Sequence, residues 1–121
     1  MKRDLKASPI LIIDDEPSVR KVLKLNLSRK GYNVDTAAGG EEGLRKLESG
    51  SYRLVLTDMK MPGMSGEQVL EQIRNTDQKT IPVIGMSGTP WLLESIGFDA
   101  VLAKPYLMKD LLNLIHRFAG E

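Results

Sequence analysis

Five side chains that could do chemistry stand directly after short apolar runs of this sequence. Two adjacent carboxylates follow the first run, one carboxylate follows the third, and a hydroxyl and an ammonium group follow the fourth and the fifth. Clustered carboxylates repel by roughly 4 kcal/mol per pair at about 4 Å and an effective dielectric constant near 20, so such a cluster needs a cation. In chain order the five residues are Asp14, Asp15, Asp58, Ser87 and Lys104.

Two cations could balance these carboxylates, Lys104 and a divalent metal ion. The chain has no cysteine and one histidine, so a metal site would use oxygen ligands, and an oxygen site with few protein ligands favours magnesium. A calcium loop would place acids at alternating positions around a central glycine, which this sequence lacks. A metal, a lysine and a hydroxyl around one carboxylate would stabilise a phosphoryl group, and Asp58 would then be the nucleophile that forms an aspartyl phosphate.

Each of these residues also has an ordinary explanation. The two adjacent acids could cap the helix that begins after them, because acids are favoured at helix N-termini. Asp58 and Ser87 could belong to turns, and Lys104 could be an exposed lysine. These alternatives explain the residues one at a time, but they do not explain why carboxylates gather together.

The elements that must position these side chains alternate regularly along the chain. Five apolar runs and five amphipathic stretches in series predict an α/β fold with a parallel sheet covered on both faces. In such sheets the residues after the carboxyl ends of the strands meet at one edge, where ligands bind. The predicted strands are 10–13, 33–36, 54–57, 83–86 and 100–103, and the predicted helices are 18–30, 41–48, 66–75, 91–96 and 107–118.

Three of the helices carry recognisable signals. Gly31 stands where a residue with left-handed backbone would end the first helix, and Ser65 and Gln68 have the spacing of a capping box at the start of the third. The last helix has a wide apolar arc, whose outer residues Leu107 and Leu114 could belong to the core or to a contact surface. The apolar stripe of the first helix is Val19, Val22, Leu23 and Leu27, and that of the last is Met108, Leu111, Leu112, Ile115 and Phe118.

Length and charge narrow the class of protein. With 121 residues we expect one domain, residues 1–121, with its core at about 8–119. Seventeen basic and 16 acidic side chains give a net charge of +1, which does not favour a nucleic acid or a membrane surface as the partner. The apolar runs are too short to span a membrane, and the first residues lack the apolar centre of a signal peptide, so we expect a cytoplasmic protein.

The motifs around these residues resemble those of the receiver domains of two-component response regulators, close in layout to the single-domain chemotaxis regulator. The resemblance covers essentially the whole chain and implies a flavodoxin-like (βα)5 fold with strand order 2-1-3-4-5. The segments that carry it are "ILIIDDEP", "LVLTDMKMPGMSG", "IPVIGMSG" and "VLAKP".

The resemblance implies a role for each residue of the cluster. Asp58 matches the phosphoacceptor, and Ser87 matches the hydroxyl that bonds a phosphoryl oxygen. Lys104 matches the lysine that pairs with the phosphoryl group, before a cis bond to Pro105. The implied Mg²⁺ ligands are Asp15, Asp58, the backbone carbonyl of Lys60, and Asp14, which would act largely through a metal-bound water.

The resemblance also implies partners. The phosphoryl donor would be a phosphohistidine of a sensor histidine kinase or a histidine phosphotransfer protein, with small acyl phosphates as substitutes. The domain would catalyse only its own phosphorylation and slow dephosphorylation, and would switch binding to an output partner that the sequence does not identify. We expect a monomer or a weak dimer, without direct contact to nucleic acid or membrane.

One segment departs from the family pattern. The stretch 87–104 is about one helical turn short, so the fourth helix should be stunted, with Pro90 at its start and Gly97 at its end. The aromatic residue often found three positions before the lysine is Val101 here, so we expect that output does not follow the usual aromatic-coupled route. Trp91 could fill the gap left by the missing turn or contact a partner, and an apolar face could still form from Trp91, Leu92, Leu93 and Ile96.

Two further residues leave their roles open. Lys60 stands two residues after Asp58, where its ammonium group could slow hydrolysis of an aspartyl phosphate or could simply be solvated. His116, the only histidine, is expected to be a surface side chain rather than a ligand.

Two competing functions remain. A phosphatase of the haloacid dehalogenase type also uses an aspartyl phosphate, but its two acids stand one residue apart after the first strand, whereas Asp14 and Asp15 are adjacent. A binding module that has kept the receiver fold without phosphorylation is the other alternative. A nucleotide-binding site is not expected, because no glycine-rich phosphate loop follows the first strand.

Overall fold

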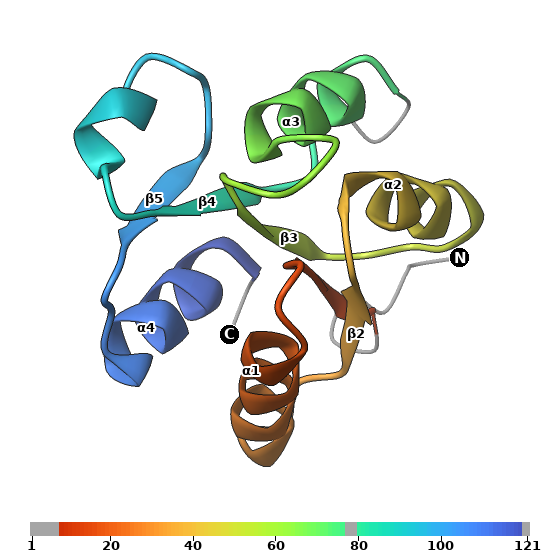
Figure 1. Ribbon diagram of the computed structural model, residues 1–121. Helices are drawn as coiled ribbons and strands as arrows, with labels where there is room; N and C mark the ends of the chain where they lie inside the picture. The colour runs from red at the N-terminus through yellow and green to blue at the C-terminus, as the bar shows by residue number, and fades with distance from the viewer. Residues whose placement is uncertain (1–7, 77–79, 120–121) are drawn as a thin grey trace.

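The computed structural model describes residues 8–76 and 80–119, and its centre is a five-stranded parallel sheet (Figure 1). The strand order is β2-β1-β3-β4-β5, as the sequence predicts. The strands are β1 (Ile10–Ile13), β2 (Val34–Ala37), β3 (Leu54–Asp58), β4 (Val83–Ser87) and β5 (Ala100–Ala103). The helices are α1 (Pro17–Arg29), α2 (Gly40–Ser49), α3 (Gly66–Arg74), the 3-10 helix η1 (Pro90–Leu93) and α4 (Met108–Ala119).

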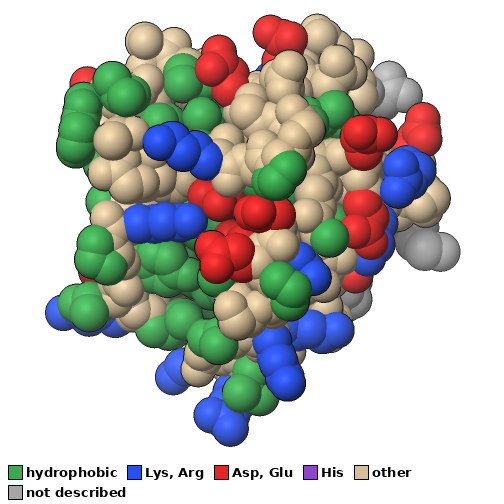
Figure 2. Space-filling model, in the orientation of Figure 1, with side chains coloured by type: hydrophobic (Ala, Val, Ile, Leu, Met, Phe, Trp, Pro, Cys, Tyr) green, Lys and Arg blue, Asp and Glu red, His purple; other side chains and the backbone are tan. Residues whose placement is uncertain are grey.

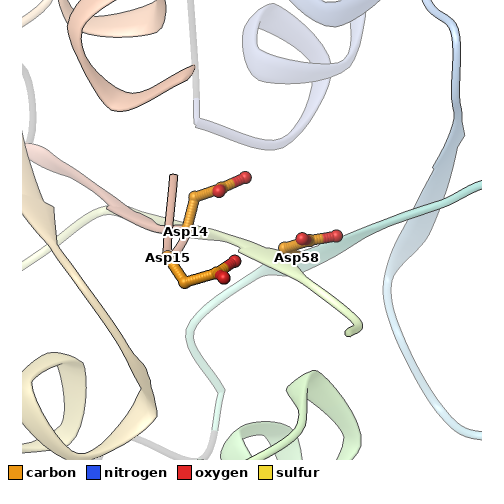
Figure 3. Close-up of side chains that lie close together, drawn as sticks. All are labelled: Asp14, Asp15 and Asp58. Atoms are coloured by element: carbon orange, nitrogen blue, oxygen red, sulfur yellow. The ribbon is translucent and has the colours of Figure 1, made fainter. Parts of the chain in front are cut away.

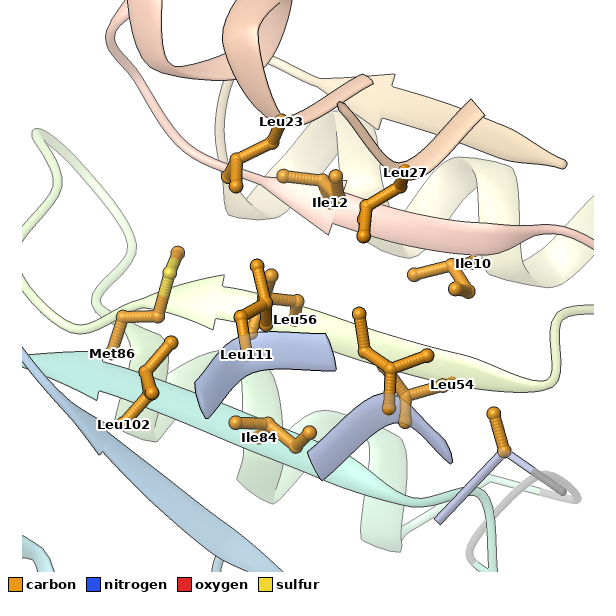
Figure 4. Packing of buried hydrophobic residues seen from close by; sticks show 12 residues of the cluster. Ile10, Ile12, Leu23, Leu27, Leu54, Leu56, Ile84, Met86, Leu102 and Leu111 are labelled. Atoms are coloured by element: carbon orange, nitrogen blue, oxygen red, sulfur yellow. The ribbon is translucent and has the colours of Figure 1, made fainter. Parts of the chain in front are cut away.

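Helices cover both faces of the sheet, as Figure 1 shows, and two apolar clusters result. On one face α1 and α4 pack against the strands, with Leu23 and Leu111 among their fully buried side chains (Figure 4). On the other face α2 and α3 pack through residues such as Leu47 and Ile73. Because both faces are covered, β1, β3 and β4 are buried along their whole length, which explains their unbroken apolar runs.

The predicted local signals fold as expected. Gly31 has a φ of 93° directly after the end of α1, a conformation that glycine adopts without strain. The Ser65 hydroxyl accepts from the backbone N–H of Gln68, while the Gln68 side chain accepts from the backbone N–H of Ser65. This capping box fixes the point at which α3 starts, and so the length of the loop that joins it to β3.

The last helix resolves the alternatives that its wide apolar arc left open. Leu111 and Ile115 are fully buried, and Leu114 is one of the partly buried residues that pack against the same cluster. Leu107 lies just before α4 and is 61% exposed, so it does not belong to the core. His116 is exposed, as expected.

Two details differ from the prediction. The second strand begins at Val34, one residue later than expected, and the carbonyl of Asn33 just before it accepts the N–H of Ile10. Val22 is 53% exposed, because the buried side of α1 is centred on Leu23 and Leu27 and is narrower than the apolar stripe.

The segment between β4 and β5 is stunted, as its length predicts. Instead of an α-helix it forms η1, a single 3-10 turn with Pro90 as its first residue. The apolar face expected there does not form, because a 3-10 helix has three residues per turn and aligns Leu93 with Pro90. Trp91 and Leu92 are each 64% exposed, whereas Leu93 is buried.

Trp91 therefore does not fill the gap left by the missing turn. Phe98 packs against the core instead, in the turn before β5, and a Cβ added at Gly85 would meet its ring at 3.2 Å. The absence of a side chain in the middle of β4 makes room for that ring.

Candidate functional site

Three carboxylates gather at the carboxyl edge of the sheet (Figure 3). Asp14 and Asp15 follow β1, and Asp58 is the last residue of β3, the strand paired with β1. One ligand oxygen from each lies within 4.8 Å of the others. Figure 2 shows acidic side chains at the centre of this face of the molecule, with basic side chains beside them. The parallel register of adjacent strands produces this cluster, as the sequence predicts.

The Asp14 side chain is fully buried, and only one of its two carboxylate oxygens has a hydrogen-bond partner among the described residues. Its Oδ1 atom accepts the backbone N–H of Glu16 at 2.9 Å, but its Oδ2 atom is buried and has no hydrogen-bond partner among the described residues. Neither acid caps α1, because the N-cap residue is Glu16 and its side chain makes no capping bond. Burial raises the pKa of Asp14, and the charges of Asp58 and Asp15 raise it further.

Asp58 is held by two donors on one oxygen. Its Oδ1 atom accepts the backbone N–H of Met59 and the Lys104 ammonium group, each at 2.9 Å. Its side chain is 9% exposed, and no donor among the described residues reaches Oδ2. Burial alone would lower the pKa of Lys104, but the hydrogen bond and charge of Asp58, together with the charge of Asp14, raise it. The lysine is therefore a permanent cation of this site.

Ser87 ends β4 beside this cluster. Its Oγ atom accepts the backbone N–H of Thr89 at 3.0 Å and lies 3.2 Å from the Thr89 hydroxyl. Its backbone carbonyl accepts the N–H of Lys104 at 2.8 Å, so β4 and β5 hold the hydroxyl and the ammonium group next to each other. The peptide bond between Lys104 and Pro105 is cis, as the resemblance implies.

The loop after β3 is fixed close to Asp58. The N–H of Met59 also bonds the carbonyl of Met86, and the N–H of Gly66 bonds the carbonyl of Met59. A Cβ added at Gly66 would overlap the backbone carbonyl of Asp58, so α3 can start here only with glycine. Lys60 lies on this loop with an exposed side chain, and it forms no ion pair with another described residue.

Sequence reasoning missed two residues that support the site. Arg20, in α1, donates from Nη1 to the backbone carbonyl of Asp14 at 2.7 Å and so fixes the turn after β1. Thr89 bonds the hydroxyl of Ser87. The spacing of Ser87 and Thr89, two residues apart after a strand, is a signal for such a side-chain-to-backbone bond and could have revealed it.

The donor set fits a hard divalent cation. Three carboxylates with one orphaned buried oxygen would be stabilised by positive charge, and the only ligand atoms on offer are oxygens, as Mg²⁺ prefers.

No helix among the described residues is long and apolar enough to cross a membrane.

The fold and the site define a class of protein. A doubly wound sheet of order 2-1-3-4-5, with an acidic cluster, a hydroxyl and a lysine at its carboxyl edge, has the CheY-like flavodoxin architecture. Residues 10–116 match the family model of the response regulator receiver domain, and the chain belongs to this family. It is thus a receiver domain of the two-component signalling systems, which decides against the haloacid dehalogenase alternative.

Similar proteins extend this result. The chain is 38% identical over 111 residues to the uncharacterized transcriptional regulatory protein YkoG of Bacillus subtilis, covering 88% of this chain and 48% of YkoG. It is 35% identical over 113 residues to the autoinducer sensor kinase/phosphatase CqsS of Vibrio cholerae, covering 88% of this chain and 16% of CqsS. The chain therefore spans less than half the length of either relative.

A solved structure with a bound ion is also similar. The response regulator TrrA of Thermotoga maritima, in complex with Mg²⁺ and BeF, has a TM-score of 0.83 and 36% identity. The match covers 92% of this chain and 98% of TrrA.

Proposed function

We propose that this receiver domain accepts a phosphoryl group on Asp58 and uses the modification to switch the binding of a partner. The observation that carries the proposal is the asymmetry of the Asp58 carboxylate. Lys104 and the N–H of Met59 both hold Oδ1, whereas no donor among the described residues reaches Oδ2. A carboxylate held at one oxygen has the other oxygen available as a nucleophile, in a fixed orientation.

The donor in this proposal is a phosphohistidine of a sensor histidine kinase or a histidine phosphotransfer protein. Oδ2 of Asp58 attacks phosphorus, a P–O bond forms, and the P–N bond breaks with its electron pair left on the histidine nitrogen. Lys104 neutralises part of the charge that the phosphoryl oxygens bring, and the Ser87 hydroxyl can donate to one of them. Hydrolysis by water later releases inorganic phosphate and restores the carboxylate, so the domain acts as a cytoplasmic switch.

Mg²⁺ fits the same proposal as the resident cation. Asp14, Asp15, Asp58 and the backbone carbonyl of Lys60 would hold it. When bound, the ion would neutralise negative charge shared between the carboxylates and the phosphoryl oxygens. The similarity to TrrA, solved with Mg²⁺ and BeF, supports this assignment, as does the orphaned oxygen of Asp14.

Labelling with a small phosphoryl donor tests the proposal. The protein is incubated with Mg²⁺ and acetyl phosphate, and its intact mass is followed with time. We expect one added phosphate per chain, none in Asp58→Asn, and normal labelling in Asp110→Asn, which removes an exposed acid from α4. A folded protein that stays unlabelled would instead support the binding module without phosphorylation, and continuous release of phosphate from phosphate esters would support an enzyme.

A further inference from the structure

The hydroxyl of Ser87 is already engaged before any phosphoryl group is present. It accepts the N–H of Thr89 at 3.0 Å and shares a second hydrogen bond with the Thr89 hydroxyl at 3.2 Å, in which either oxygen could donate. Among the described residues, no hydrogen bond joins this hydroxyl to Asp58. Two contacts to one residue thus hold the Ser87 side chain in its present orientation, and both are lost if the side chain rotates toward a phosphoryl oxygen.

Thr89 is also the residue from which η1 starts. It is the N-cap of this 3-10 helix, and its carbonyl accepts the N–H of Leu92 at 3.0 Å, the bond that closes the turn. The turn carries Trp91 and Leu92, which are two of the most exposed large apolar side chains in the described part of the chain. In Figure 1, η1 is the cyan turn between β4 and β5. A single residue therefore links the Ser87 hydroxyl to an exposed apolar surface.

We propose that Thr89 is a positioning residue that holds the Ser87 hydroxyl in the unphosphorylated state, and that its release on phosphorylation rearranges η1 and the surface of Trp91 and Leu92. The phosphoryl oxygens compete with Thr89 for the same hydroxyl. When the Ser87 side chain rotates toward them, the N-cap residue of η1 loses both of its hydrogen bonds to the Ser87 hydroxyl. Because η1 has only one turn, it has few other bonds to keep it in place.

This inference rests on the proposed function and extends it to the route by which the signal leaves the site. It predicts that Thr89 opposes the phosphorylated state, so removing its hydroxyl should favour that state. Thr89→Val keeps the shape of the side chain and the backbone N–H but deletes the hydroxyl. Thr89→Ser keeps the hydroxyl and is the conservative variant.

The test measures binding of beryllofluoride, a mimic of the phosphoryl group, by titration calorimetry in the presence of Mg²⁺. We expect Thr89→Val to bind about fivefold more tightly than the unchanged protein, the effect of one net neutral hydrogen bond. Thr89→Ser should bind as the unchanged protein does. Thr80→Val is the matched control, because Thr80 is exposed and lies before the opposite end of β4.

The outcomes separate this inference from the proposed function. If the unchanged protein does not bind beryllofluoride, the proposed function fails. If it binds and Thr89→Val binds equally well or more weakly, the role of Thr89 is wrong while the proposed function stands.

The tryptophan gives an independent readout of the η1 surface. Trp91 is the only tryptophan in the chain, so its fluorescence reports on η1 alone. We expect its emission maximum to shift when beryllofluoride saturates the site, and we expect no shift in Ser87→Ala at saturation. An unchanged emission maximum in the saturated protein would show that η1 does not respond.

Discussion

Replacing Asp14 with Asn should stabilise the metal-free protein. Asp14 is fully buried, one of its oxygens has no partner among the described residues, and two other carboxylates lie beside it. Asn keeps an oxygen that can accept the N–H of Glu16, and it places a donor where the orphaned oxygen stands. The substitution thus removes a buried charge without removing the one hydrogen bond that this side chain makes.

The geometry sets the size of the effect. The ligand oxygens of the three acids lie within 4.8 Å of one another, and at an effective dielectric constant near 20 one such pair of charges repels by about 3.5 kcal/mol. Lys104 offsets part of this repulsion through its contact with Asp58, and Asp15 is partly solvated. We therefore expect a gain of about 2 kcal/mol in the free energy of unfolding, or on the order of 6–10 °C in Tm.

The pH dependence has a definite sign. The pKa of Asp14 is raised above its ordinary value of 3.8 in the folded protein, mainly by burial. At a pH well below 3.8, the side chain is protonated in both the folded and the unfolded state, and the unchanged protein and Asp14→Asn should be about equally stable. As the pH rises through the folded-state pKa, the unchanged protein loses stability, so the advantage of Asn should grow and then stay constant toward neutral pH.

Urea unfolding with EDTA at several pH values measures this advantage, and repeating it with Mg²⁺ tests its cause. At ten times its dissociation constant, an ion that binds only the folded state adds about 1.4 kcal/mol, so Mg²⁺ should stabilise the unchanged protein more than Asp14→Asn. Asp110→Asn removes an exposed acid and controls for net charge. An Asp14→Asn variant that is less stable than the unchanged protein at pH 7 in EDTA would refute this reasoning.

Three further substitutions probe the frame around the site. Gly66→Ala should destabilise the fold by about 3 kcal/mol in urea unfolding, because the added Cβ would overlap the Asp58 carbonyl. Gly39→Ala is its control: a Cβ added at Gly39 would have no atom within 4 Å, so the free energy of unfolding should change by less than about 0.5 kcal/mol. Ser65→Ala should cost about 1 kcal/mol through loss of the capping box, and Ser51→Ala, at an exposed serine, should be neutral. Lys60→Ala should shorten the lifetime of phosphorylated Asp58, followed by the decay of the added mass, if the ammonium group slows the attacking water; an unchanged lifetime would mean that Lys60 is only solvated.

The parts of the structure that follow from local patterns could be predicted from the sequence. A strand buried on both faces requires an unbroken apolar run, so β1 begins and ends where the sequence predicts. The edge strand β5 is only partly buried, but its short apolar run also has the predicted bounds. Their parallel arrangement brings residues far apart in the chain, such as Asp14 and Asp58, to one edge. The capping box and the left-handed Gly31 likewise depend only on neighbouring residues.

The parts that depend on tertiary packing could not be predicted. The length of segment 87–104 predicts a stunted helix, but the choice between Trp91 and Phe98 as the core side chain depends on the gap above Gly85. Similarly, the apolar stripe of α1 includes Val22, yet burial depends on how closely the neighbouring elements approach. The support that Arg20 gives to the turn after β1 is a contact to a backbone carbonyl, which leaves no pattern in the side chains.

The charges of the site explain why the Ser87 hydroxyl matters to the switch. Three carboxylates and Lys104 carry a formal charge of minus two, which one Mg²⁺ would neutralise. Phosphorylation replaces the single charge of Asp58 with about two on the phosphoryl group, so the site again becomes negative and gains three acceptor oxygens. Further donors are then needed, and Ser87 is held beside Lys104 by the sheet. In the proposed switch, the phosphoryl group therefore supplies the free energy that replaces the hydrogen bonds between Ser87 and Thr89 with a bond to a phosphoryl oxygen. Because Thr89 is the N-cap residue of η1, this change reaches η1.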